Sequence, residues 1–449
     1  MDNLIKRTRE ADPRFLCLFL AAGLQCLPAA FGIFPRYLLN YFTMVPWVLF
    51  LGIAWGQSLS PTAKKQLLLG GILALWFAVV QCYHNLMIPD PRSPGSLFTA
   101  CLLAFPFAVV SGDGKRALGL KIAGGVFLCA ALVLTLLTGM LFLGLLPEFL
   151  NDHIYWDGAR LCAMWHPNLT ANVFLIAMGF CFYFASSVPQ WRRKAVFLAL
   201  SALFFLLMCL TNSRTAVLNA CILTAGAVFF LIWKGGIKRF VLAALAAVAV
   251  LLALFSLYQA VFSFHESRMI QQYIQAHPDV TLNIPDLQVD QETGQVSLHT
   301  EAAQNSLFQD LATLNSRTAI WKSALKIIGE DPKILIRGTP DIGILLTAQH
   351  NWDIPHAHNS WVETLLGLGL PGLLCALVFT SLGAWHILRL FFFGGHSLPR
   401  KLVALLTLCL LISGMLENYL FLASRDYPCA NFIFFLCLGY LTQWKEAEA

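Results

Sequence analysis

The sequence predicts an all-α polytopic membrane protein, with about twelve transmembrane helices and one large extracytoplasmic loop between the ninth and tenth spans. Its 449 residues are 58% hydrophobic and only 12% charged, whereas soluble domains carry about 25% charged residues. A chain with so few charges must bury apolar surface in lipid as well as in a core. The net charge of +6 is modest, which suits basic cytoplasmic loops better than nucleic-acid binding.

Apolar runs recur along the chain at the length that a membrane span requires, about 20 residues. The expected spans are 14–34, 38–57, 66–84, 96–112, 118–146, 168–187, 194–212, 214–233, 239–263, 360–392, 400–422 and 427–444. The fourth of these is short, and the fifth and tenth are long.

Clusters of lysine and arginine occur in every second short loop, and this distribution predicts the orientation of the spans. The basic set comprises the N-terminal cluster and the groups within 64–65, 115–116, 192–194, 234–239 and 400–401. The opposite loops hold single residues such as Arg36, Arg92 and Arg160. Because basic loops face the cytoplasm, both termini are expected there and the long segment after the ninth span is expected outside.

The chain therefore divides into three expected regions. These are spans one to nine over 1–263, the large loop over 264–355, and spans ten to twelve over 356–449. Within the loop, 266–311 is polar and has a hairpin signal at 287–299. Apolar residues recur at helical spacing over 301–329, which suits either an amphipathic helix on the membrane surface or a small soluble cap.

The expected spans contain almost no ionisable residues, and Lys121 and Glu417 lie near span ends. An ion-coupled transporter usually carries acids or bases near the middle of the membrane. The chemistry of this chain is therefore expected at the extracytoplasmic interface.

The pentapeptide Asn-Ser-Arg-Thr-Ala occurs twice on that side, at 212–216 and at 315–319. In each copy, Asn or Ser can cap a helix that begins at or after the arginine, Arg214 or Arg317. A helix N-terminus favours anions, and a guanidinium adds bidentate binding of phosphate oxygens. Two such sites suit a pyrophosphate, although ordinary capping beside an interfacial arginine explains each copy equally well.

A third polar feature lies where the large loop returns to the membrane. His356 and His358 flank Ala357, and Asn359 follows directly. Histidine titrates near neutral pH and can take a proton from a hydroxyl group. The pair can also be plain interfacial histidines; metal binding is less favoured because no third ligand has suitable spacing, so no metal or cofactor is expected.

Weaker candidates for substrate binding lie in two other outer loops. His166 and Asn168 open the sixth span, where they either line the site or merely start a helix at Pro167. Arg425 lies in the last outer loop, where a surface role beside Asp426 is the simpler reading.

At these residues the chain resembles the O-antigen ligase and O-antigen polymerase family of bacterial inner membranes. The resemblance covers the layout of spans and late periplasmic loop, with Arg214 before the loop and Arg317 within it. It also covers a ligase-like pattern of His, then Asn, Ser or Gln, nine residues, Gly, two residues, and Gly, Thr or Tyr. His358-Asn359, Gly369 and Gly372 satisfy this pattern in full. The polar stretch 266–311 has no counterpart in the family pattern.

The resemblance implies a metal-independent glycosyltransferase of lipopolysaccharide biosynthesis, whose donor is a glycan on undecaprenyl pyrophosphate. In ligases the acceptor is a sugar hydroxyl of lipid A-core, and in polymerases it is a second carrier-linked unit. Arg214 and Arg317 are then expected to bind the pyrophosphate, and His358 to deprotonate the acceptor in one inverting displacement. His356 either orients His358 or lines the acceptor side, and membrane lipid surrounds the bundle.

The complete His-Asn-to-Gly pattern favours a ligase over a polymerase. A flippase or exporter that holds a lipid-linked glycan with the same arginines is an alternative of another class. It needs no His358 and forms no glycosidic bond. A non-catalytic assembly subunit is a third alternative, and it tolerates substitution of all three residues.

Overall fold

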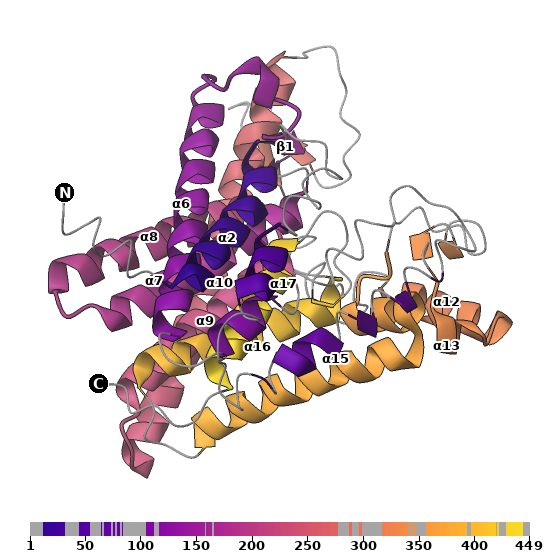
Figure 1. The fold of residues 1–449 in the computed structure, drawn as a ribbon. Helices are drawn as coiled ribbons and strands as arrows, with labels where there is room; N and C mark the ends of the chain where they lie inside the picture. The colour runs from indigo at the N-terminus through magenta and orange to yellow at the C-terminus, as the bar shows by residue number, and fades with distance from the viewer. Residues whose placement is uncertain are drawn as a thin grey trace.

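The computed structural model is mostly helical, and helices of spanning length form its body (Figure 1). Seven helices in the described part of the chain are long and apolar enough to cross a membrane. The structure describes residues 12–31, 45–53, 64, 67–72, 75–76, 79–80, 83, 105–111, 116–157, 159–163, 166–276, 287–289, 296–298, 317–339, 342–343, 345–346, 356–392, 397–418, 420–421 and 428–442.

Nine of the helices coincide with expected spans. They are α2 (Pro13–Phe31), α6 (Arg116–Phe142), α7 (Pro167–Ser187), α8 (Trp191–Leu210), α9 (Arg214–Ile232), α10 (Ile237–Ala276), α15 (Ser360–Phe392), α16 (Leu398–Leu416) and α17 (Pro428–Leu441). Seven of them reach spanning length, whereas α2 and α17 contain shorter apolar stretches. Much of the expected spans 38–57, 66–84 and 96–112 lies outside the described residues.

Helix α7 is the centre of the bundle. It packs against α6, α8, α9, α16 and α17. Within its apolar 18-residue stretch, 83% is buried inside the protein. Its apolar side chains point in all directions, as expected for a helix enclosed by other helices. One example is the stacking of Phe174 on Phe204 of α8, with ring centroids 5.9 Å apart.

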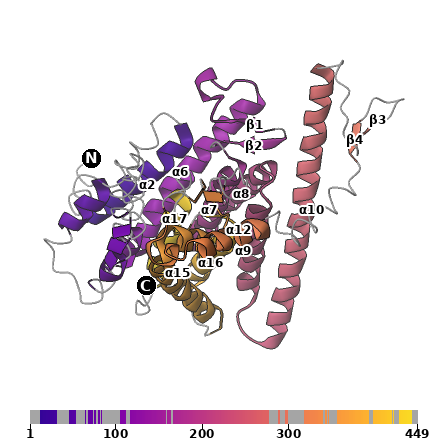
Figure 2. The same cartoon turned by 90° about the vertical axis from the view of Figure 1, so that its right-hand side faces the viewer.

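Helix α10 lies at the edge of the bundle, and Figure 2 shows it standing along one side. It packs against α8 and α9, yet only 6% of its apolar 18-residue stretch is buried inside the protein. The helix continues beyond residue 263, the expected end of this span, and reaches Ala276. The sequence has no Gly or Pro from 237 to 277, so nothing breaks the helix where its composition turns polar.

Short elements complete the fold. They are the turn η1 (Glu148–Leu150), the hairpin of β1 (Tyr155–Asp157) and β2 (Arg160–Cys162), the hairpin of β3 (Leu287–Val289) and β4 (Val296–Leu298), α12 (Arg317–Glu330) and α13 (Ile334–Arg337). The hairpin expected at 287–299 is confirmed, with Leu287 opposite Leu298. The helical periodicity at 301–329 corresponds to α12, and its first part, 301–316, lies outside the described residues.

Two glycines allow α13 to pack backbone against backbone on α15. Gly338 and Gly369 both have a φ of 67° and a ψ of −169°, a conformation that side chains exclude. A Cβ on Gly369 would lie 2.7 Å from the carbonyl oxygen of Ile336, and one on Gly338 would lie 2.2 Å from that of Gly367. The Thr339 amide donates to the Leu366 carbonyl across the same contact, at 2.7 Å. This contact fixes α12 and α13 beside the start of α15 (Figure 1).

Replacing Gly369 by alanine should therefore destabilise the protein. The forbidden backbone conformation alone costs about 1–3 kcal/mol, and the clash with α13 adds to it. Thermal unfolding of the purified protein in detergent should occur at a lower temperature than in wild type. Gly125→Ala in α6 is the matched control, because a Cβ there meets nothing within 4 Å. Equal unfolding temperatures for the two variants would contradict the role assigned to this contact.

Candidate active site

Glu417, directly after α16, joins the polar residues at one end of the bundle. Its side chain is buried, and Oε1 accepts hydrogen bonds from Nη2 of Arg317 at 2.8 Å and from Nδ2 of Asn168 at 3.0 Å. Its other oxygen, Oε2, lies 3.0 Å from Nδ1 of His358. One carboxylate thus connects the start of α12, the start of α7 and the loop before α15.

The charge of Glu417 is stabilised by these neighbours. Burial raises the pKa of this carboxyl, but the hydrogen bond with His358 and the charges of His358 and Arg317 outweigh it and leave the pKa below its ordinary value. Glu417 is therefore a carboxylate at neutral pH, and it balances the positive charge of Arg317. The same carboxylate favours a donated hydrogen from Nδ1 of His358, and this leaves Nε2 as the basic nitrogen of the ring.

The backbone of Ala357 holds the histidine loop in place. Its amide donates to Oε2 of Glu363 in α15 at 2.7 Å, and its carbonyl accepts from Nε1 of Trp321 in α12 at 3.0 Å. His358 itself has a positive φ of 49°, which is uncommon for a residue with a side chain. Such strain persists only where the surroundings impose it, and it often marks a functional residue. Ala357 also links the helix that begins with Arg317 to the loop that carries His358.

Asn359 and Ser360 fasten the start of α15 to the end of α16. The Asn359 side-chain oxygen accepts from the amides of Trp361 and Val362, both at 3.0 Å, as an N-cap does. Its Nδ2 donates to the Met415 carbonyl at 2.9 Å. The Ser360 hydroxyl donates to the carbonyl of Glu417 at 2.8 Å. These bonds place Glu417 and His358 opposite each other.

His356 packs against His358, with ring centroids 4.1 Å apart. It is buried, and its Nδ1 has no hydrogen-bond partner among the described residues. Burial, followed by the charge of His358, lowers the pKa of His356 to about 4. His356 is therefore neutral at physiological pH.

The start of α7 supplies two more of the expected residues. His166 is the N-cap of this helix, and its Nδ1 accepts from the Asn168 amide at 3.2 Å. Burial lowers the pKa of His166, and the charge of Glu417 opposes this shift only in part. The Asn168 side chain donates to Glu417, so it contacts the centre of the site directly.

Arg214 begins α9, at the turn that follows α8. Asn212 in this turn has a positive φ of 51°, and its Oδ1 accepts from the Tyr258 hydroxyl of α10 at 2.5 Å. Arg160 of β2 donates to the Thr211 carbonyl at 3.2 Å. Arg214 and Arg160 both act electrostatically on Tyr258, and Arg160 also acts on His166. Two guanidinium groups thus lie at this turn, beside the α7 end of the site.

The helix starts predicted at the two Asn-Ser-Arg-Thr-Ala copies are confirmed, whereas the predicted capping is confirmed at neither copy in the described residues. Both α9 and α12 begin at the arginine of their copy. Ser213 is the N-cap of α9, but its side chain makes no capping hydrogen bond, so the expected cap is wrong for this residue. Thr211 instead accepts from the Ser213 amide through its hydroxyl, at 3.2 Å. Asn315 and Ser316 lie outside the described residues.

The structure thus brings most of the expected site residues to one end of the bundle. Arg317, His358, His356, Asn168 and His166 surround Glu417, and Arg214 lies at the neighbouring turn with Arg160. Arg425 lies outside the described residues. No cluster of three or more potential metal ligands occurs in the part of the chain that the structure describes.

Sequence reasoning missed Glu417, Glu363 and Trp321 as parts of this site. Glu417 carried one signal, because a carboxylate at the end of an otherwise apolar run needs a partner when it is buried. The other two carried none, since a glutamate and a tryptophan near a membrane interface are ordinary. Their roles depend on contacts across α12 and α15 that no sequence spacing predicts.

An apolar helical bundle with histidine, carboxylate and arginine gathered at one end defines an integral membrane protein with the residue types of group-transfer chemistry. Residues 197–377 match the family model described as O-antigen ligase. This match supports the expected O-antigen ligase family over that segment, which is less than half of the chain, and the long apolar helices support a membrane protein. No curated protein matches the chain. The matched segment contains Arg214, Arg317 and His358, whereas Asn168 and Glu417 lie outside it.

The low pKa of His356 predicts a loss of stability on acidification. The unfolded chain binds a proton as the pH falls below about 6.5, but the folded protein resists protonation until about pH 4. The unfolded state therefore binds more protons in this window, so stability falls as the pH drops through it. Glu417 adds to the loss at lower pH, since the stabilisation from its lowered pKa is complete above the ordinary glutamate value of 4.5 and is lost as the pH falls below that value.

Thermal unfolding measured from pH 8 to pH 4 tests this prediction. Other buried carboxyl and imidazole groups also titrate in this range, so the difference between wild type and a variant isolates the contribution of His356. The variant His356→Asn should lose less stability than wild type as the pH falls from 6.5 to 4.5, because it lacks the titrating group. Profiles of equal slope for variant and wild type in that range would exclude His356 as the cause.

Proposed function

We propose that this protein is an O-antigen ligase, which transfers a glycan from undecaprenyl pyrophosphate to a sugar hydroxyl of lipid A-core. The observation that carries the proposal is the shared carboxylate, because Glu417 holds an arginine and a histidine side by side. An arginine suits the leaving diphosphate, and a histidine suits the attacking hydroxyl. The two halves of a glycosyl transfer are thereby provided within one polar cluster.

His358 acts as the general base of this reaction. The acceptor oxygen attacks the anomeric carbon while its proton moves to Nε2 of His358. The bond between that carbon and the pyrophosphate oxygen breaks, and the carrier diphosphate leaves with the electron pair. Glu417, hydrogen-bonded to Nδ1, stabilises the imidazolium that forms, in the way that a carboxylate orients and stabilises a catalytic histidine in hydrolases. A single displacement inverts the anomeric carbon.

Arg317 and Arg214 bind the pyrophosphate and stabilise its developing charge. One nitrogen of Arg317 is used by Glu417, and a guanidinium has five N–H donors, so others remain for phosphate oxygens. Arg214 and Arg160 add positive charge at the neighbouring turn. Lysine cannot replace either arginine, because its ammonium group is a point charge and lacks the planar, bidentate hydrogen-bond donors of a guanidinium.

The remaining expected residues have three different proposed roles. His356 and His166 line the acceptor side, next to His358. Asn168 and Asn359 keep Glu417 and the start of α15 in place through their own hydrogen bonds. Arg425 is proposed as a substrate contact on the basis of its outer-loop sequence position alone.

The proposed topology follows the distribution of basic residues. Twelve spans cross the bacterial inner membrane, both termini are cytoplasmic, and the active site faces the periplasm. The proposed regions are spans one to nine over 1–263, a periplasmic loop over 264–355 and spans ten to twelve over 356–449, with α10 extending into the loop. The lipid A-core acceptor is favoured over a second carrier-linked unit because the His-Asn-to-Gly pattern of the ligases is complete here.

Transfer by the purified protein tests the proposed reaction. Undecaprenyl-pyrophosphate glycan should label lipid A-core in the presence of a chelator. His358→Ala should reduce the rate by about 10²–10⁴-fold, the contribution of a general base. Arg317→Ala and Arg317→Lys should both be impaired, by about 10²–10³-fold for the loss of a charge-stabilising donor. Lengthening of the carrier-linked glycan without lipid A-core would instead establish a polymerase.

The absence of any new glycosidic bond, with the carrier still bound, would favour a flippase or exporter. Lys326→Ala is a suitable control for the arginine variants. Lys326 lies on the same helix as Arg317, but its side chain is exposed and pairs only with Glu330 among the described residues. This variant should transfer at the wild-type rate.

Glu417→Gln tests the role of the shared carboxylate. The amide keeps the size of the side chain but cannot balance the imidazolium charge. We expect kcat to fall about 10- to 100-fold, with a smaller change in the KM for the donor. Glu417→Asp keeps the charge and should recover part of the lost kcat. A structural role alone would lower the amount of folded protein and leave the kcat of the folded fraction unchanged, which would exclude the catalytic assignment.

A further inference from the structure

Asn219 is a buried amide within α9, a helix of mostly apolar composition. Its side chain is fully buried. Its Nδ2 donates to the hydroxyl of Ser413 in α16 at 2.8 Å, and its backbone carbonyl accepts from Sγ of Cys409 in the same helix at 3.4 Å. Asn219 thus provides two hydrogen bonds between α9 and α16, and such bonds between membrane-spanning helices are directional, unlike apolar packing.

Helices α9 and α16 are close antiparallel neighbours. A Cβ on Gly226 would lie 2.5 Å from Cδ2 of Leu405, so the absence of a side chain at Gly226 allows the two helices to approach. Gly226 comes after Asn219 in α9, whereas Leu405 comes before Ser413 in α16. The helices therefore run in opposite directions, and the start of α9 lies at the same end of the bundle as the end of α16.

The bond between Asn219 and Ser413 lies close to the candidate active site. Arg214 precedes Asn219 by about one and a half turns of α9, and Glu417 follows Ser413 by about one turn, directly after α16. Because the helices are antiparallel, Arg214 and Glu417 lie beyond the bond on the same side. The height of Arg214 relative to Glu417 is therefore determined by the register of α9 on α16.

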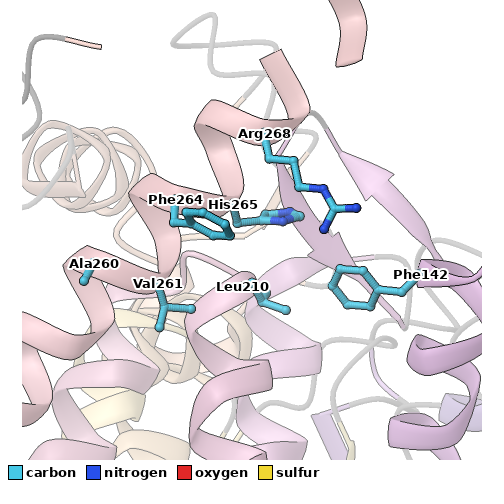
Figure 3. A pocket seen from close by; sticks show the side chains of 7 residues that line it. All are labelled: Phe142, Leu210, Ala260, Val261, Phe264, His265 and Arg268. Atoms are coloured by element: carbon cyan, nitrogen blue, oxygen red, sulfur yellow. The ribbon is translucent and has the colours of Figure 1, made fainter. Parts of the chain in front are cut away.

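Other contacts hold the turn between α8 and α9, which precedes Arg214. Tyr258 of α10 and Arg160 of β2 both donate hydrogen bonds to this turn, so they tie it to α10 and β2 and not to α16. Beside the turn, Leu210 at the end of α8 lines a pocket of about 390 Å³ between α6, α8 and α10, which Figure 3 shows. Close packing on that side does not fix the turn, so its position relative to α16 depends on the contacts between α9 and α16.

The Asn219 amide also has a cost for the stability of the fold. Its Oδ1 is buried and has no hydrogen-bond partner among the described residues. A buried polar atom without a partner destabilises a protein. In coiled coils, a single buried asparagine fixes the register of the helices at a cost in stability. Asn219 shares these features, since it combines full burial, a bond across a helix interface and one unsatisfied atom.

We propose that Asn219 is a positioning residue of the transfer site, which fixes the register of α9 on α16 through Ser413. The inference rests on the proposed function, because it requires Arg214 to bind the diphosphate of the donor. Arg317 is bonded to Glu417 at the end of α16, so the register sets the position of Arg214 relative to both residues. Without the bond, apolar side chains allow α9 to shift along α16, and the two arginines no longer match the oxygens of one diphosphate.

The double variant Asn219→Leu/Ser413→Ala tests this role, because it replaces a polar pair with an apolar pair. Such a replacement is nearly neutral or stabilising, so the variant should unfold at or above the wild-type temperature in detergent. It should nevertheless bind undecaprenyl pyrophosphate about three- to tenfold more weakly, which is less than the full loss of a charge-assisted hydrogen bond. Native mass spectrometry of the full-length protein measures this affinity. A lower unfolding temperature with unchanged affinity of the folded fraction would overturn the proposal.

A double-mutant cycle with Arg214→Ala tests whether Asn219 acts through this arginine. Arg214→Ala alone should weaken diphosphate binding about tenfold or more. Adding Asn219→Leu/Ser413→Ala should then change the affinity less than about twofold, because no arginine remains to be positioned. Equal losses in both backgrounds would contradict the proposal. Binding without transfer by wild type would reject the proposed reaction and leave this cycle decisive, whereas no binding by wild type would reject both.

Two matched comparisons isolate the bond between the helices. Ser413→Thr keeps the hydroxyl, and Ser413→Val has the same shape without it, so the valine variant should bind the diphosphate about threefold or more weaker than the threonine variant. Thr224→Ala removes a hydroxyl whose bond goes to the Ala220 carbonyl within α9, at 2.8 Å. This control should keep the wild-type affinity. Equal affinities of the threonine and valine variants would exclude the Ser413 hydroxyl from the proposed role.

Discussion

The buried carboxylate of Glu417 is the constraint on which the candidate site depends. Taking a charge out of water costs several kcal/mol unless partners compensate for it. Here Arg317, Asn168 and His358 provide that compensation, and they come from three segments that are far apart in the sequence. Since each partner is needed to offset the burial, folding the bundle also assembles the site. Because Arg317 and His358 both contact the Glu417 side chain, the groups proposed to bind an anion and to accept a proton lie close together.

Much of the His-Asn-to-Gly pattern serves the framework and not the chemistry. Asn359 caps α15 and ties it to the last turn of α16. Gly369 allows α13 to contact α15 backbone to backbone. Only His358 among the pattern residues contacts the buried carboxylate. The pattern is therefore specific because it encodes a local geometry, in which a strained histidine is held between a capped helix and a tightly packed neighbour.

The sequence predicted the helical class, the positions of seven long spans, the hairpin at 287–299 and the family that residues 197–377 match, because hydropathy and local motifs determine these features. It also predicted that helices begin at or after Arg214 and Arg317, and α9 and α12 begin at these arginines. It failed where distant contacts decide. The contact of Glu417 with Arg317 and the clamp on Ala357 both depend on partners that are far away in the sequence. Polar residues near the ends of spans are common, so the sequence alone could not single out Glu417 as part of the site.

The clamp on Ala357 has a consequence for how such proteins can vary. Trp321 and Glu363 grip the two sides of one residue, so α12 and the histidine loop are joined directly. The spacing between Arg317 and His358 is thus set by this junction, whatever the length or composition of the preceding 277–316 stretch. The distance between these two side chains therefore does not require a fixed number of residues between α10 and α12.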